Sequence, residues 1–176
     1  SPPTTKELFY RWTEIGTFHG IMRTHHGSDE CRNWVFDRDE ETIAHFRRYA
    51  TIRTLLYPYL AGLVEEAMQF GLPLMRHPVL VAPDAPELWS DQVYRFFLGD
   101  DLLVTPVVDQ GATELFVSLP GEGWWPLFGG SPLAEEAVLV DVPPTEVPVH
   151  VRPGTILPLL IEAPDSFYGA SDPTVS

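Results

Sequence analysis

Apolar positions recur at helical intervals near the start of the chain. Within residues 4–16 they are spaced by three or four positions, and the segment opens with Thr4 and Glu7 at the spacing of a capping box. Gly16 stands where such a helix would stop. The pattern predicts a helix over residues 4–16, followed directly by a strand over residues 17–23.

A longer helical pattern runs from Asp37 or Asp39 to Phe70, and Gly71 stands at its end. Pro58 lies inside this stretch and lacks the N–H that a helix interior needs, so we expect it to kink or divide the helix. Residues 72–83 read as a further strand that is interrupted by Pro78.

The period changes in the second half of the chain, after a linker-like Pro-rich stretch near residue 85. Short β-rich runs alternate there with turn clusters that contain Gly and Pro, which is typical of an antiparallel sandwich. The predicted strands lie within residues 101–108, 113–120, 123–128, 137–142, 146–151 and 155–161.

The predicted fold class is α/β followed by all-β. The first half alternates helix and strand, which favours parallel βα units, but a closed (β/α)8 barrel needs about 250 residues. We therefore expect residues 1–82 to be part of a larger sheet or barrel that this chain does not complete. Residues 83–176 are expected to form an antiparallel β-sandwich with an irregular tail.

Charge is unevenly distributed over the 176 residues. The net charge is −14, and residues 81–176 hold 2 basic against 15 acidic side chains, so we expect no nucleic-acid partner. No apolar run approaches the roughly 18 residues of a membrane span, and we expect no membrane partner. A single cysteine and the lack of a signal-peptide pattern leave the compartment open, with the cytoplasm favoured.

The polar residues after the predicted strand over 17–23 are the first candidates for a site. Arg23, His25 and His26 stand where a barrel strand ends, and barrels carry their sites at that edge. The same residues could instead form a loop whose histidines are merely solvated or cap a helix. A metal could also be bound by His19, His25 and His26 together with Asp29, Glu30 and Cys31. No metal-ligand spacing is present, however, and we expect no metal.

Other polar or aromatic motifs have simpler readings. Asp100 and Asp101 precede an apolar run and read as a turn before a strand. Trp124 and Trp125 could stack on a sugar, although packing in the sandwich core is the more common use of such residues. Cys31 lacks the local signature of a thiol protease.

Three separated blocks of sequence carry a family resemblance. They begin with "ELFYRWTEIGTFHGIMRTHHG", "ETIAHFRRYATIRTLLYPYL" and "LGDDLLVTPVVDQGATELFV", and in this order they resemble glycoside hydrolase family 31 over nearly the whole chain. The resemblance implies a retaining α-glycosidase, such as an α-glucosidase, α-xylosidase or sulfoquinovosidase, with a (β/α)8 barrel followed by a β-sandwich. It also implies that residues 1–82 are the last βα units of that barrel, which is incomplete in this chain. Two aspartates act in these enzymes, one as nucleophile and one as general acid/base.

The resemblance also implies which roles fall inside the chain. Both catalytic aspartates of the family lie upstream of the first block, so we expect no catalytic residue here and no activity of this chain by itself. His25 is similar to the histidine that hydrogen-bonds hydroxyls of the sugar. Arg23 is expected to support the strand end, and His26 is a further rim candidate. We expect a carbohydrate substrate, the remainder of the barrel as partner, and no cofactor.

Alternatives remain open at this point. The combination of "YRWTE", "RTHHG", "NW" and "ETIAHF" is closer to the sulfoquinovosidase and related bacterial branches than to the maltase branch. Gly20 departs from the proline that many family members carry there, and the tail after Pro158 lacks the pattern of a distal β-domain. The chain could also be a non-catalytic carbohydrate-binding or interaction module, or a subunit that completes a barrel with another chain.

Overall fold

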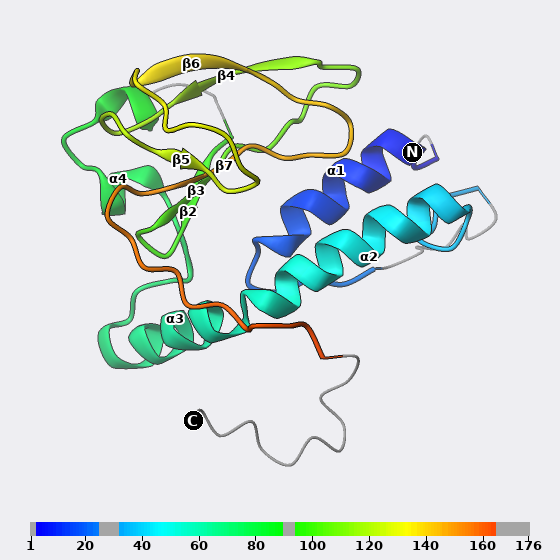
Figure 1. Ribbon diagram of the computed structural model, residues 1–176, viewed down its shortest axis with the longest axis horizontal. Helices are drawn as coiled ribbons and strands as arrows, with labels where there is room; N and C mark the ends of the chain where they lie inside the picture. Colours follow the sequence, from blue (N-terminus) through cyan, green and yellow to red (C-terminus); the bar gives the residue numbers. More distant parts are fainter. Residues whose placement is uncertain (1–2, 25–31, 90–93, 165–176) are drawn as a thin grey trace.

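Three helices lie beside a strand-rich part in the computed structural model (Figure 1), which describes residues 3–24, 32–89 and 94–164. Helices α1 (Lys6–Thr17) and α2 (Glu40–Leu55) pack along each other, and α3 (Tyr57–Phe70) follows α2. Within these ranges, no helix has both the length and the apolar character that a membrane span requires.

Helix α1 begins one residue later than the capping pattern predicts. Thr5 is its N-cap, and the Thr5 Oγ1 accepts the N–H of Leu8 at 3.2 Å. Glu7 closes no capping box on Thr4, because the Glu7 Oε1 accepts the N–H of Gly111 at 2.7 Å. A long-range contact to the strand-rich part has replaced the local one.

The predicted strand over residues 17–23 is wrong. Thr17 is the last residue of α1, and residues 18–24 pair with no strand in the described part of the chain. Arg53 of α2 donates to the carbonyls of Thr17, His19 and Gly20. Carbonyls that a strand would offer to a neighbouring strand are thus bound to a guanidinium.

The division of the long helical stretch is confirmed. Helix α2 has Asp39 as N-cap, whose Oδ1 accepts the N–H of Thr42 at 2.7 Å. It ends at Leu55, and α3 starts at Tyr57 with Pro58 in its first turn, where the missing N–H costs nothing. Gly71 ends α3 in the left-handed conformation, with φ of 73°.

The predicted strand over residues 72–83 is largely wrong. Strand β1 covers Met75–Arg76, and Pro78 begins the short helix α4 (Pro78–Val81) instead of interrupting a strand. The His77 side chain caps this helix by accepting the N–H of Val79. A 3-10 turn, η1, follows at Pro86–Leu88.

The second half is antiparallel throughout its described strands. One sheet has the order β1-β2-β3-β7-β5, and a second consists of β4 and β6. Five predicted strands are confirmed in shortened form, whereas residues 155–161 form no strand and β2 was not predicted. The strands are β2 (Phe96–Leu98), β3 (Leu102–Val104), β4 (Glu114–Ser118), β5 (Trp125–Pro126), β6 (Ala137–Asp141) and β7 (Val149–Val151).

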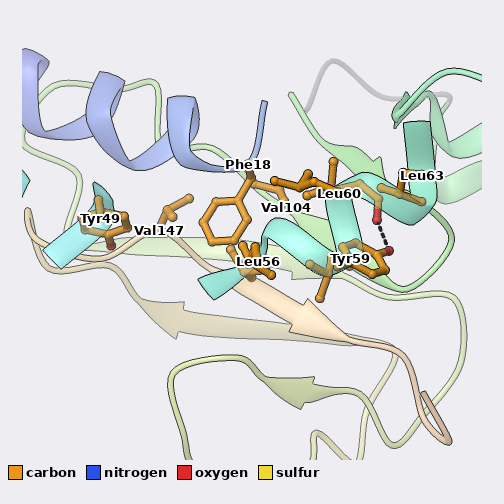
Figure 2. Packing of buried hydrophobic residues seen from close by; sticks show 11 residues of the cluster. Phe18, Tyr49, Leu56, Tyr59, Leu60, Leu63, Val104 and Val147 are labelled. Carbon is orange, nitrogen blue, oxygen red and sulfur yellow. Dashed lines mark hydrogen bonds between the residues drawn. The ribbon is translucent and has the colours of Figure 1, made fainter. Parts of the chain in front are cut away.

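The larger sheet separates two cores. One face packs Phe97 and Leu103 against Val117 of β4 and Trp124, with Val138 and Val140 of β6 beside them, which makes the sandwich. The opposite face packs on the helices, as Figure 2 shows. This second core, the helix–sheet core, consists of Phe18, Tyr49, Leu56, Tyr59, Leu60, Leu63, Leu98, Leu102, Val104, Val147 and Val149.

The sheet begins before the predicted domain boundary. Strand β1 pairs with β2 through Met75 with Leu98 and Arg76 with Phe97, so the segment around residue 75 belongs to the larger sheet. A division between residues 1–82 and 83–176 stays a prediction.

Candidate functional site

The predicted sugar-binding cluster is only partly visible. Arg23 and Thr24 are exposed and lie after the turn that follows α1. His25 and His26 lie outside the described residues, so their placement beside Arg23 is not tested. Asp29, Glu30 and Cys31, named above as possible metal ligands, also lie outside them.

A cavity of about 500 Å³ adjoins Arg23 and Thr24. Its walls come from α1, from residues 21–24 and from residues 33–36, and most of the lining is apolar. Trp12 and Ile21 line it and are 66% and 78% exposed. The cavity lining therefore combines the polar side chains of Arg23 and Thr24 with exposed apolar ones.

Residues 33–36 are tied to the start of α1. Asn33 Oδ1 accepts the N–H of Thr4 at 3.0 Å, and the Trp34 N–H donates to the Thr4 carbonyl at 3.0 Å. The indole Nε1 of Trp34 donates to the Thr42 Oγ1 at 3.0 Å, which links the loop to α2 as well. The loop that follows the candidate cluster is thus held on both helices.

Trp34 lines the cavity but is not among the site residues predicted from the sequence. The Lys6 Nζ and the Arg38 guanidinium carbon each lie 5.6 Å from the centre of its ring, at distances typical of cation–π contacts. Its signal in the sequence was the "NW" pair of the family resemblance, which says nothing about the contacts of the ring.

The turn before Arg23 is fixed by α2. Besides the three carbonyls bound by Arg53, the ring of His19 lies edge-on to Phe96, with centroids 5.3 Å apart. Burial, and then the Arg53 charge, lower the pKa of His19, which favours the neutral imidazole. This histidine lines the cavity and contacts Phe96 of the larger sheet.

The two adjacent aspartates make structural contacts. Asp100 Oδ1 accepts from Arg76 at 2.5 Å, and Arg76 also binds Glu66 of α3. Asp101 Oδ1 accepts the hydroxyl of Thr155 at 2.9 Å. Both carboxylates sit in the turn between β2 and β3, which is where the sequence placed them.

The tryptophan pair is split by the structure. Trp124 is 1% exposed and packs on Phe97 in the sandwich core, with ring centroids 6.1 Å apart. Trp125 on β5 is 50% exposed. At most one of the two rings could therefore stack on a sugar.

Metal-binding residues do not gather in the part of the chain that the structure describes. Within residues 3–24, 32–89 and 94–164, no group of three or more His, Cys, Asp or Glu side chains could hold an ion. His19, the one member of the possible ligand set that is described, instead contacts Phe96.

Comparison with protein families gives two matches in sequence order. Residues 1–63 match the model described as the glycosyl hydrolases family 31 TIM-barrel domain. Residues 71–157 match the glycosyl hydrolase family 31 C-terminal domain. Residues 64–70, which separate the two models, form the second half of α3.

Curated relatives include enzymes of several names. The chain is 38% identical over 148 residues to the sulfoquinovosidase of Escherichia coli, which covers 84% of this chain and 22% of the relative. It is 40% identical over 121 residues to the sulfoquinovosidase of Agrobacterium fabrum, covering 69% and 18%. It is 32% identical to the α-glucosidase of Mucor javanicus, covering 88% and 18%. The chain thus spans about a fifth of the length of these relatives.

Solved structures have the same fold over most of the chain. A family 31 sulfoquinovosidase from E. rectale, in complex with the aza-sugar inhibitor IFGSQ, superposes with a TM-score of 0.80 at 30% identity, over 87% of this chain and 23% of that chain. A dextranase mutant of Flavobacterium johnsoniae, complexed with isomaltotriose, gives 0.76 at 33% identity, over 87% and 19%. Both of those proteins carry sugar-like ligands.

Proposed function

This chain belongs to glycosyl hydrolase family 31, and we propose that it is the C-terminal part of a retaining α-glycoside hydrolase. In this proposal, residues from the barrel model supply one side of the sugar-binding subsite, and the sandwich supports them. The observation that carries the proposal is the ordered match of a barrel model and a C-terminal-domain model along one chain.

The catalytic carboxylates are proposed to lie outside these 176 residues. Retaining glycosidases need two carboxyl groups about 5 Å apart, one as nucleophile and one as acid/base. The adjacent aspartates of the chain are engaged elsewhere, Asp100 with Arg76 and Asp101 with Thr155. The chain's share of about a fifth of its relatives' length leaves room for both carboxylates upstream.

His25 is our candidate for the residue that binds the sugar. A neutral imidazole offers one donor and one acceptor, which suits a pair of neighbouring hydroxyls. Arg23 would support this segment, and His26 would lie at the rim. The anchoring of the preceding turn by Arg53, and of the following loop by Thr4 and Thr42, supports a cluster held on both sides.

The rest of the barrel is the proposed partner of the exposed apolar wall. Leu8, Trp12 and Ile21 line the cavity and are 45%, 66% and 78% exposed. Large apolar side chains gathered in this way mark a surface that is covered in the functional molecule. Further strands of a barrel would cover it and place their own residues beside Arg23.

Sulfoquinovosidase-type specificity is the favoured finer reading. The two curated relatives at 38% and 40% identity both carry that name. An α-glucosidase-type specificity is the competitor, since a relative at 32% identity carries that name. A non-catalytic carbohydrate-binding module is a further candidate, with the half-exposed Trp125 as its possible contact.

The decisive experiment joins the chain to its upstream sequence and compares rates on an aryl α-glucoside and an aryl α-sulfoquinovoside. We expect turnover by the complete protein and none by residues 1–176. The change His25→Ala should lower kcat/KM by a factor on the order of 10² or more, because its hydrogen bonds strengthen in the transition state.

His77→Ala is the matched control. His77 is exposed and caps the short helix α4, so its removal should leave the rates within about twofold. Full activity of the His25→Ala protein would refute the assigned role, and no turnover by the complete protein on either substrate would refute the hydrolase reading.

A further inference from the structure

A buried group of polar side chains links α1, α2 and the loop between β6 and β7. Arg11 of α1 is 5% exposed, and its Nη2 donates to the carbonyl of Val142 at 2.9 Å. Its Nη1 donates to the carbonyls of Pro143 at 2.9 Å and Glu146 at 3.2 Å. One guanidinium of a barrel helix thus holds a loop of the sandwich.

Glu14 lies one turn further along α1 and is fully buried, at 0% exposed. Its Oε2 is 3.3 Å from the Arg11 Nη1. Its Oε1 is 3.6 Å from the Nε2 of His45 on α2, which is too long for a hydrogen bond. Neither of these two atoms, Oε1 or Nε2, has a hydrogen-bond partner among the described residues.

The tautomer of His45 follows from its other contacts. A hydrogen bond with the backbone of Tyr10 raises the pKa of His45, which requires a ring N–H as donor; because Nε2 has no partner, we assign this N–H to Nδ1. The Tyr10 ring stacks on His45 with centroids 3.9 Å apart and an angle of 4°, which fixes the imidazole. The Nε2 therefore presents a lone pair to Glu14.

If Glu14 were ionised, its Oε1 would also be a hydrogen-bond acceptor, so two acceptor atoms would face each other. Two unpaired acceptors 3.6 Å apart in a buried site are costly, because each has lost its water and gained no donor. One proton on either atom removes this clash of acceptors, because the other atom then faces a donor 3.6 Å away. We propose that Glu14 and His45 share one proton, and that this proton locks α1 to α2 beneath the loop held by Arg11.

Electrostatics at the site agree with this geometry. Burial is the main cause that raises the pKa of Glu14 to about 8, and the Arg11 and Arg48 charges oppose it. Burial likewise lowers the pKa of His45 to about 4. The other titratable or charged groups that face the pair are Tyr10 and Arg11 on α1, Glu41, Arg48 and Tyr49 on α2, and Glu146 in the loop.

The shared proton has a specific pH signature. In the folded chain the pair holds one proton from about pH 4 to about pH 8. In the unfolded chain, with ordinary pKa values of 4.5 and 6.5, the pair has lost both protons above pH 6.5. The folded state then binds the extra proton, so stability falls as pH rises from 6.5 to 8. The folding equilibrium constant should fall about tenfold per pH unit in this window, or roughly 30-fold in all.

The test follows the pair in the full chain by NMR from pH 4 to pH 9, reading the Glu14 carboxyl carbon and the His45 ring nitrogens. We expect both signals to change together near pH 8 and not between pH 5 and pH 7. Independent titration of Glu14 near 4.5 and of His45 near 6.5 would overturn the proposal. This measurement needs no variant, so it decides the question even if a variant fails to fold.

Urea unfolding against pH supplies a second readout. Glu14→Gln mimics the protonated acid, since its amide can accept from Arg11 and donate to His45, so the roughly 30-fold fall between pH 6.5 and pH 8 should disappear. Glu65→Gln removes an exposed carboxylate from α3 and should keep the fall. Identical profiles for Glu14→Gln and the unchanged chain would refute the shared proton. Neither outcome depends on the proposed glycosidase activity.

Discussion

Tyr59 donates its hydroxyl proton to the carbonyl of Leu98 at 2.7 Å (Figure 2), and the same hydroxyl occupies the space that a Cβ on Gly99 would need. This contact joins α3 to the turn after β2, inside the core that the helices share with the larger sheet. Its closeness leaves no room for a side chain at residue 99.

Replacement of Gly99 by alanine should be strongly destabilising. Gly99 has φ of 61°, and a Cβ there would meet the Tyr59 hydroxyl and lie 2.7 Å from the Cδ2 of Leu63. We expect a loss of about 2–4 kcal/mol in the free energy of unfolding, from backbone strain and overpacking together. Gly71→Ala is the control, because φ is 73° there but nothing lies within 4 Å. It should cost about 1 kcal/mol, and equal losses in urea unfolding would contradict the close contact.

Arg11→Lys should weaken the link between the helices and the sandwich. A lysine ammonium cannot reproduce the fork that reaches the carbonyls of Val142 and Pro143, so buried acceptors lose their donor. We expect a loss of about 2–4 kcal/mol in urea unfolding. Arg48→Lys is the matched variant, since the Arg48 side chain is 44% exposed where it binds Glu146, and it should cost less than about 1 kcal/mol. The reverse order of the two losses would refute this account.

His150 should make the fold sensitive to acid. It is 3% exposed on β7, and burial lowers its pKa to about 4 from an ordinary 6.5. Between pH 6.5 and pH 4, His150 is therefore protonated in the unfolded chain but neutral in the folded chain. The free energy of unfolding should fall as pH drops across this window. His150→Leu removes the group, so its unfolding free energy should depend less on pH across this window. A fall of equal slope in both proteins would show that His150 is not the cause.

Trp124 and Trp125 should respond differently to truncation. Trp124→Ala empties a site in the sandwich core and should cost about 3–5 kcal/mol in unfolding free energy. Trp125→Ala should cost less than about 1 kcal/mol, because half of its surface already faces water.

Calorimetric titration of the chain with maltose tests the alternative hypothesis of a non-catalytic carbohydrate-binding module. Binding that disappears in Trp125→Ala would support it, and a flat trace for the unchanged chain would remove its support.

Local signals in the sequence were good predictors where one residue decides the backbone. Pro58 could not continue a helix, and Gly71 could adopt the left-handed end, so both boundaries were predictable. The short strands were also predictable in type, because their apolar runs stand between clusters of Gly and Pro. The predicted strands are longer than the observed ones. A strand ends where its neighbour no longer pairs with it, and residue propensities do not show where that happens.

The errors lie where distant contacts override local pattern. The apolar stretch after Gly16 reads as a strand, yet Arg53 binds its carbonyls from a helix that is over thirty residues away in sequence. Glu7 has the spacing of a capping box but binds Gly111 instead. The buried Glu14 and its partner His45 left no trace in the sequence, because a charged residue on a helix normally faces water.

The helix–sheet core has a further consequence for how this region can change during evolution. Phe18, Tyr49 and Leu56 on the helical side interleave with Leu102 and Val149 on the sheet side, so each half supplies the other's interior. If either half were replaced by the equivalent part of a relative, its side chains would leave cavities or overlap in the helix–sheet core. Barrel end and sandwich should therefore be inherited as one block, and recombination between relatives should spare the stretch that joins them.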